Sequence, residues 1–132
     1  MAIPWGISAA AWPLACILMA GMLDPITAHI ERYMDLLSAR QKLVASNIAN
    51  ADTPGYRTRD IDFQSEYQSA SAAQPAAVEV PGLKTKNDGN NVSVDREARL
   101  LSENALRFNL ASGLMRSELR MVRSAIEEGK NG

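Results

Sequence analysis

Only a few residues of this 132-residue chain are of the types that carry out catalysis, and two carboxylates are the clearest candidates. Asp60 and Asp62 are two residues apart, so in a strand both would lie on one face, as paired acid–base groups require. However, Arg57 and Arg59 are adjacent in sequence, and the only histidine, His29, is far along the chain. We therefore expect a solvated charged arm, or ion pairs with a neighbour, rather than a catalytic pair.

Metal ligands and nucleophiles are equally sparse. The single cysteine, Cys16, excludes an intramolecular disulfide, and a single histidine leaves a zinc site without its usual partners. Asp88-Gly89-Asn90 resembles part of a calcium loop, but the later glutamate and the ligand spacing are missing. The serines are not accompanied by a nucleophile elbow. The sequence thus predicts no enzyme, no metal, no cofactor and no small-molecule substrate.

The bulk composition restricts the function further. The formal net charge is −1, from 14 basic and 15 acidic residues, which lacks the basic excess typical of nucleic-acid binding. The length is that of one domain. Aromatic residues are few, and both tryptophans lie in the first dozen residues, so the rest of the chain has little bulky material for a dense core.

The first 23 residues carry no charged side chain, and several interpretations compete for them. A secretory signal lacks its basic region, prolines interrupt a transmembrane helix, and Pro13 disagrees with a lipoprotein signal before Cys16. We favour an extension upstream of a true start at Met19 or Met22. If residues 1–23 are translated, we expect them to form a tail that is flexible or that contacts the membrane surface.

Residues 24–52 have the pattern of a long helix. Asp24 is a good N-cap, Pro25 fits the first helical position, and the pattern continues to about Asn50. The apolar stripe, spaced by threes and fours, is Ile26, Ile30, Tyr33, Met34, Leu37, Val44, Ala45 and Ile48.

A turn and a loop-rich, flexible middle are predicted for residues 53–92. Pro54-Gly55 supplies the fixed and then the positive φ of a type II turn. Residues 57–63 alternate enough for an extended arm or a short strand. A weak hairpin is also possible between residues 78–80 and 83–85, around Pro81-Gly82.

Residues 93–128 have the pattern of a second long helix, beginning at Ser93 or Asp95. The apolar spacing is close to a heptad and predicts a coiled-coil seam. The apolar positions are Val94, Ala98, Leu101, Ala105, Phe108, Ala111, Met115, Leu119, Val122 and Ile126.

The predicted fold is mainly α: two long terminal helices form a coiled-coil-like pair, joined by a loop-rich middle with at most a short β-hairpin. Such a pair removes little apolar surface from water relative to the chain entropy lost, so it is a poor monomer. We expect the isolated chain to be partly disordered and to complete its core against neighbouring subunits. A heterologous contact of this kind propagates as a helix or tube.

The stretch from Leu43 to Tyr56, with its Asn-Ile-Ala-Asn and Thr-Pro-Gly-Tyr segments, resembles the signature of the flagellar rod and hook protein family. Residues 57–63, which end in Asp-Phe, are similar to the proximal-rod subgroup. Residues 89–97 and 103–108 match the carboxyl-terminal part of that subgroup. The loose middle is unmatched, and the extension before Asp24 departs from the family pattern.

The resemblance implies a structural subunit of the proximal rod of the basal body, required for motility. Its helices would form an inner tube around the export channel and transmit torque. It implies unfolded export by the flagellar type III apparatus and assembly in the periplasm. The implied partners are further copies of the chain, other rod proteins and the MS-ring/export-gate side of the basal body.

Two sets of residues are expected to carry this function. Asn47 and Asn50 lie on one side of the last helical turn, where their amides can cap carbonyls or bind a neighbour's backbone, and Tyr56 can anchor the turn. The junction set is Asn47, Ile48, Ala49, Asn50, Asp52, Thr53, Pro54, Gly55 and Tyr56. The helix-packing set is Ile30, Leu37, Val44, Leu101, Phe108, Met115, Leu119 and Val122.

Two alternatives remain open at this stage. One is a membrane-tethered coiled-coil adaptor that uses residues 1–22 as its anchor. The other is a neighbouring rod subunit of the same family, which a longer insert after the Asn-rich turn would favour.

Overall fold

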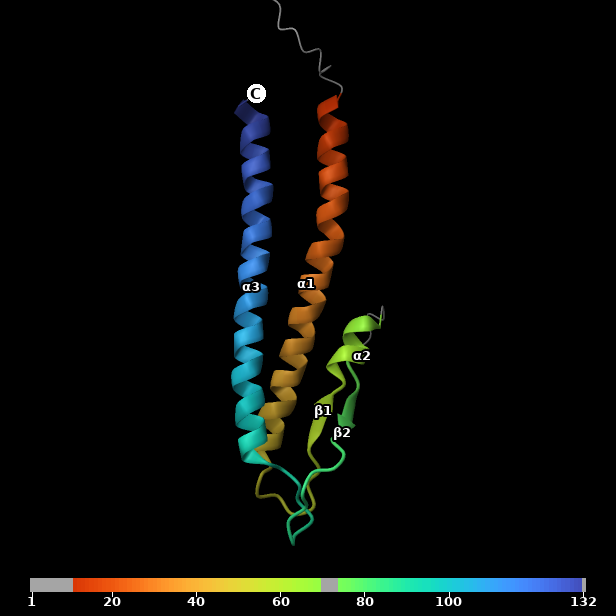
Figure 1. Ribbon diagram of the computed structural model, residues 1–132, viewed down its shortest axis with the longest axis vertical. Helices are drawn as coiled ribbons and strands as arrows, with labels where there is room; N and C mark the ends of the chain where they lie inside the picture. The colour runs from red at the N-terminus through yellow and green to blue at the C-terminus, as the bar shows by residue number, and fades with distance from the viewer. Residues whose placement is uncertain (1–10, 70–73, 132) are drawn as a thin grey trace, which may run out of the picture.

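The computed structural model describes residues 11–69 and 74–131, and the protein is mainly helical, as predicted. Two long helices, α1 (Ala11–Ala49) and α3 (Val94–Asn131), lie side by side and run in opposite directions (Figure 1). Between them in sequence come β1 (Arg59–Ile61), α2 (Phe63–Gln68) and β2 (Ala77–Glu79). The expectations for residues 1–10 lie outside the described residues.

The start of α1 differs from the prediction, because Asp24 and Pro25 lie inside the helix rather than at its beginning. A proline in this position removes the N–H that would bond the carbonyl of Gly21, which favours a helix boundary. The Ala, Leu and Met residues upstream are strong helix formers, and the helix continues through them to Ala11. Its carboxyl end, Ala49 followed by a turn at Asn50, agrees with the prediction.

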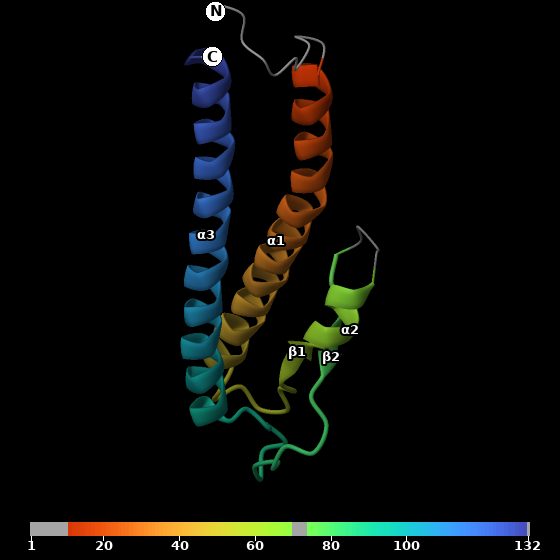
Figure 2. The ribbon, with the colours of Figure 1, turned by 45° about the horizontal axis from the view of Figure 1, so that its top comes forward.

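The second long helix begins where expected, at Val94. The Ser93 hydroxyl accepts a hydrogen bond from the backbone N–H of Arg96 at 3.4 Å, so Ser93 is the N-cap. The two long helices are closest at the end where α3 begins and diverge toward their other ends (Figure 2). This end of the molecule, where α1 ends and α3 begins, is called the junction below.

The sheet is a two-stranded antiparallel pair with Arg59 opposite Glu79 and Ile61 opposite Ala77. The predicted hairpin between residues 78–80 and 83–85 is therefore wrong in its partner, although residues 59–61 do form the short strand that their alternation indicated. Within the described residues, residues 77–79 pair as a ladder only with β1. β1 in turn packs against α1.

The short helix α2 was not predicted and packs on α1. Its N-cap is Asp62, whose Oδ1 accepts the N–H of Ser65 at 3.2 Å. The Tyr33 ring of α1 meets Phe63 and Tyr67 edge-on, with centroids 5.3 and 5.8 Å away. Both views place β1, α2 and β2 on one side of α1 and α3 on the other (Figures 1 and 2).

The core of the described residues is half polar. Its apolar members are Leu36, Leu37, Val44, Ile61, Val92 and Ala111. Its polar members are Asn47, Thr58, Asp60, Asn90, Asn91, Glu97 and Asn104. On α3 the buried residues Glu97, Asn104 and Ala111 are seven apart, so this stripe faces α1.

The expected apolar seam of α3 is therefore offset from the stripe that faces α1, although the two share Ala111. Leu101, Phe108 and Leu119 are exposed, although Leu37 and Val44 on α1 are buried. Among the other residues expected to pack, Ile30, Met115 and Val122 are half-buried and Ile48 is exposed. The prediction selected the most apolar stripe of α3, whereas the hydrogen bonds that Glu97 and Asn104 make with α1 turn a more polar stripe toward α1. Asn104 illustrates this, because its Nδ2 donates to the carbonyl of Leu37 at 2.8 Å.

Candidate assembly site at the helix junction

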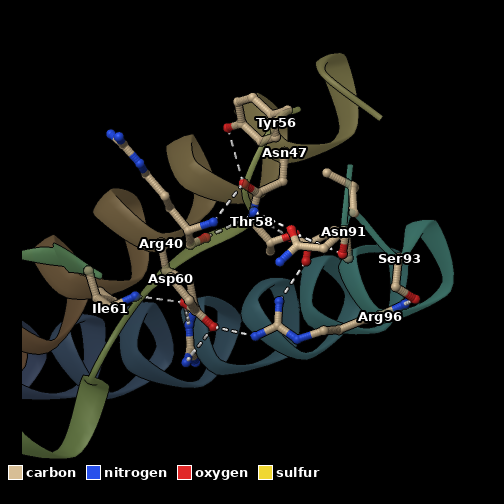
Figure 3. Close-up of polar contacts among 12 residues, drawn as sticks. Arg40, Asn47, Tyr56, Thr58, Asp60, Ile61, Asn91, Ser93 and Arg96 are labelled. Atoms are coloured by element: carbon tan, nitrogen blue, oxygen red, sulfur yellow. Dashed lines mark hydrogen bonds and ion pairs between the residues drawn. The ribbon is translucent and has the colours of Figure 1, made fainter. Parts of the chain in front are cut away.

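Asn47, at the end of α1, is the centre of the junction and is fully buried. Its amide pairs with the backbone of Arg59 as a strand would: Nδ2 donates to the Arg59 carbonyl at 2.8 Å, and Oδ1 accepts the Arg59 N–H at 3.1 Å. Nδ2 also donates to Glu97 Oε2 at 3.0 Å. Figure 3 shows Asn47 between the turn and the chain that leads to β1. One side chain thus ties α1, β1 and α3 together.

Tyr56 packs against the same side chain. Its hydroxyl donates to Asn47 Oδ1 at 3.3 Å and lies 3.2 Å from the Ser46 hydroxyl. The expectation that Tyr56 anchors the turn agrees with this geometry, but its hydroxyl bonds to α1 rather than only to water. The turn itself is type II, because Gly55 has φ +73° and the Tyr56 N–H bonds the Thr53 carbonyl at 3.2 Å.

The carboxyl end of α1 is closed by a distant loop. Asn90 is buried, and its Nδ2 donates to the carbonyls of Asn50 and Thr53 at 2.9 and 2.8 Å. The Lys86 ammonium donates to the carbonyl of Ala51 at 2.8 Å, where a positive charge also complements the helix dipole. The side chain of Asn50, by contrast, bonds only locally among the described residues: its Nδ2 donates to the carbonyl of Ser46, and its Oδ1 accepts from the Thr53 hydroxyl.

The loop over residues 86–91 fits against the turn at a glycine–glycine contact. Gly89 has φ +83°, and a Cβ there would lie 3.4 Å from Gly55 Cα. Asn91 then joins the turn to the start of α3, since its Oδ1 accepts the Thr58 N–H at 2.7 Å. Positions 55 and 89 therefore both favour glycine, Gly55 for its positive φ and Gly89 for its positive φ and its close approach to Gly55.

An ionic network occupies the space beneath Asn47. Asp60 accepts hydrogen bonds from Arg40 Nε at 2.9 Å and from Arg96 Nη2 at 2.8 Å, so it bridges α1 and α3 (Figure 3). Arg96 also donates to Glu97 Oε1 at 2.6 Å. Glu97 is fully buried, and its two oxygens are used by Arg96 and Asn47. Each buried carboxylate is thus paired and hydrogen-bonded, as burial requires.

The environment of Asp60 changes its pKa. Burial by itself raises the pKa, but the hydrogen bond from Arg40, the Ile61 N–H at 2.8 Å, the charge of Arg40 and the bond from Arg96 together lower it below 3.8. The carboxylate is therefore held in its charged form. The expected charged arm is wrong for Asp60, which is buried in ion pairs within its own chain, whereas Asp62 caps α2.

The junction set predicted from sequence divides into two groups. Asn47 and Tyr56 bond to each other at the junction, and Asn90 ties Asn50 and the Thr53–Gly55 turn to it through their backbone. The side chains of Ile48, Ala49 and Asp52 are exposed. Sequence reasoning missed the partners that complete the site, which are Arg40, Thr58, Asp60, Lys86, Asn90, Asn91, Arg96 and Glu97. Thr58, Asp60, Lys86, Asn90 and Asn91 belong to the charged and Asn-rich segments between Tyr56 and α3, and the other three lie in the long helices, but nothing in the spacing assigned their partners.

Comparison with known proteins identifies the family. The sequence profile of the family described as "Flagella basal body rod protein" matches residues 34–57, which include Asn47 and the turn. Flagellar basal body rod protein FlgB of Salmonella typhimurium is 31% identical over 137 aligned residues, which cover 82% of this chain and 99% of the relative. The chain belongs to the flagellar basal body rod protein family.

Other FlgB proteins are similarly related. The Escherichia coli protein is 29% identical, with 82% of this chain and 99% of the relative covered. The Borrelia hermsii protein is 28% identical, with 73% of this chain and 91% of the relative covered. These relatives are structural rod proteins, and this chain is a structural rod subunit of the basal body.

The membrane-adaptor alternative is disfavoured by this family membership. Over residues 11–69 and 74–131, none of the helices is both long and apolar enough to cross a membrane.

Proposed function

We propose that the chain assembles helically as a proximal rod subunit, encloses the export channel with its terminal helices and transmits torque toward the distal rod. This role needs a part that keeps its shape and a part that bonds to neighbours. The junction suits the first requirement, because its buried polar groups hold α1, β1 and α3 at a defined angle. The long helices suit the second.

The observation that carries the proposal is the apolar surface left open on α3 after α3 has packed on α1. The exposed large apolar residues of this helix are Val94, Leu101, Leu106, Phe108, Leu110, Leu114, Leu119, Met121 and Ile126. These residues lie on two flanks of the helix, and monomeric proteins rarely expose so much apolar surface on one element, so such surface marks interfaces. In the proposed rod, Leu101, Phe108, Met115, Leu119 and Val122 meet neighbouring subunits, while Leu37 and Val44 stay within the chain.

The junction set has a matching role in this proposal. Asn47, Thr53, Pro54, Gly55 and Tyr56 fix the corner at the end of α1. Ile48, Ala49, Asn50 and Asp52 are on the outer side of that corner and are available to a neighbour. Residues 24–52 and 93–128 would serve as the tube-forming helices, with residues 53–92 outside them.

Family membership supports the setting that we propose. The chain is exported through the flagellar type III apparatus and assembles in the periplasm. There it contacts further copies of itself, other rod proteins and the MS-ring/export-gate side of the basal body. It performs no catalysis in this role.

The test is a strain that lacks the gene, examined for swimming and, by electron microscopy, for basal bodies. We expect no swimming and no rod beyond the inner-membrane ring, with both restored by the chain that starts at Met1. A chain that starts at Met22 tests whether the upstream residues are dispensable, as proposed. Intact rods and normal swimming in the deletion strain would refute the proposal.

A further inference from the structure

An apolar groove runs along the α1–α3 pair on the side of α2. Its walls, which define the docking groove, are Ile26, Ile30, Tyr33, Leu110, Leu114 and Glu118, with Tyr67 of α2 at its edge. Leu110 and Leu114 are 62% and 60% exposed, so most of their surface is open to a partner. A groove of this shape fits the apolar face of a helix.

The docking groove contains one carboxylate oxygen without a partner. Glu118 Oε2 is inaccessible to solvent, and no group in the described part of the chain hydrogen-bonds it. Arg107, which also lines the groove, already pairs with Glu103 and lies over the Phe63 ring at 5.8 Å. Glu118 as a whole is only half-buried and lines the groove, so its negative charge suits an occupant that brings a cation among apolar side chains.

The same chain carries a surface of that chemistry. Leu119, Arg123 and Ile126 are spaced by four and three, so they share one face of α3, and all three are exposed. This ridge is on the flank of α3 away from the docking groove, because Leu119 is five residues, or about 140° of helical rotation, from Leu114. One molecule thus presents a groove on one flank and a complementary ridge on the other.

We propose that the docking groove receives the Leu119–Arg123–Ile126 ridge of a second copy of this chain, with the Arg123 guanidinium bonded to Glu118. The contact is heterologous, since different surfaces of the two copies meet, and each bound copy leaves a free groove and a free ridge. The inference rests on the proposed rod function and assigns the surfaces that link one subunit to the next.

Disulfide trapping tests which surfaces meet. In a Cys16→Ser background, one chain carries Leu114→Cys in the groove and a second carries Leu119→Cys on the ridge. The two are co-expressed in the deletion strain, and purified basal bodies are oxidised. We expect a cross-linked dimer only when both chains are present. Dimers from the Leu119→Cys chain alone would indicate a ridge-to-ridge contact and would overturn the proposal, as would the absence of a mixed dimer.

A charge exchange tests the ion pair. Glu118→Arg and Arg123→Glu should each reduce the mixed cross-link at least tenfold, because each places like charges together. Glu118→Arg combined with Arg123→Glu in one chain should restore the cross-link, whereas Arg120→Glu, on an adjacent exposed arginine, should leave it unchanged. Loss of cross-linking in the combined variant, or an equal loss with Arg120→Glu, would overturn the assigned pair.

The basal-body fraction separates this inference from the proposed function. If the chain is incorporated into basal bodies but is not trapped groove to ridge, or is trapped to a different rod protein, only the docking assignment fails. If the wild-type chain is absent from basal bodies, the proposed function itself fails.

Discussion

The junction and the shafts of the long helices are built in opposite ways. At the junction, buried residues are mostly polar, and Asn47, Asp60, Asn90 and Glu97 are satisfied by groups from distant parts of the same chain. Along the shaft of α3, large apolar residues such as Leu110, Leu114 and Leu119 remain exposed. The polar end is complete within one molecule, whereas we propose that the apolar shaft is completed by another.

This difference separates stability from assembly. Hydrogen bonds and ion pairs have strict geometry, so a polar junction specifies one arrangement of its segments. Apolar contact is less directional and can be shared among several neighbours. Substitutions at the junction should therefore alter the isolated chain, and substitutions on the shaft should alter only the polymer.

The largest effect is expected at Asp60. Asp60→Ala leaves the guanidinium groups of Arg40 and Arg96 without their shared carboxylate, and we expect a loss of roughly 3 kcal/mol in the free energy of unfolding. Urea unfolding followed by circular dichroism measures it. Asp62→Ala is the matched control and should cost about 1 kcal/mol, the value of an N-cap. Equal losses for the two variants would contradict a special role for Asp60.

A slightly smaller effect is expected at Asn47. Asn47→Ala leaves Glu97 Oε2 and the backbone N–H and carbonyl of Arg59 without this partner, and should cost about 2 kcal/mol. Asn50→Ala, in the same sequence signature, removes only local bonds and should cost at most about 1 kcal/mol. If Asn50→Ala lowers the free energy of unfolding more than Asn47→Ala does, the signature stabilises the chain through Asn50, and the central role of Asn47 at the junction is contradicted.

Acid should weaken the junction less than removal of Asp60 does, because the carboxyl group is only partly protonated near its pKa. Since the pKa of Asp60 is lower in the folded chain than the usual 3.8, the unfolded chain takes up the proton first as pH falls. The stabilisation is complete well above pH 3.8 and declines below it. Unfolding midpoints from pH 6 to pH 3 should fall more steeply for the wild type than for Asp60→Asn. Parallel curves would show that Asp60 is not the titrating group.

The smallest effect on the isolated chain is expected on the shaft. Leu114→Gln, on an exposed surface, should change the free energy of unfolding by less than about 0.5 kcal/mol. The same variant should fail to restore swimming in the deletion strain. Ala111→Gln, one turn away but buried against α1, provides the contrast, because it should destabilise the monomer as well. Normal swimming with Leu114→Gln would show that this part of α3 does not contribute to the interface between subunits.

Much of the fold was accessible from local sequence. Pro54-Gly55 located the end of α1 and its turn type, and the periodicity of residues 93–128 gave α3 nearly to its ends. The start of α1 was missed because capping signals at Asp24 and Pro25 were weighed above the helix propensity of the residues before them. The partner of residues 77–79 was missed because α2 separates the paired strands in sequence.

The candidate site was predictable only in part. Asn47 and Tyr56 were found through the sequence signature, but the role of Asp60 depends on arginines of α1 and α3, and that of Glu97 depends on Asn47 of α1. The face of α3 was predicted only in part, since Ala111 is buried but Leu101, Phe108 and Leu119 are exposed, and the reason is physical. Periodicity measures which stripe is most apolar, and in a chain that assembles, that stripe need not be the one that packs within the monomer.

The loop that closes the end of α1 also sets an order of events in time. The Lys86 ammonium, Asn90 and Glu97 reach back 35, 40 and 50 residues to Ala51, Asn50 and Asn47. Contacts across such separations form late, because the intervening chain must first lose its freedom. A chain that leaves a narrow passage amino end first has no finished corner until residues 86–97 are free. On the proposed export route, the chain can therefore offer a rigid corner to the growing polymer only after residue 97 has left the passage.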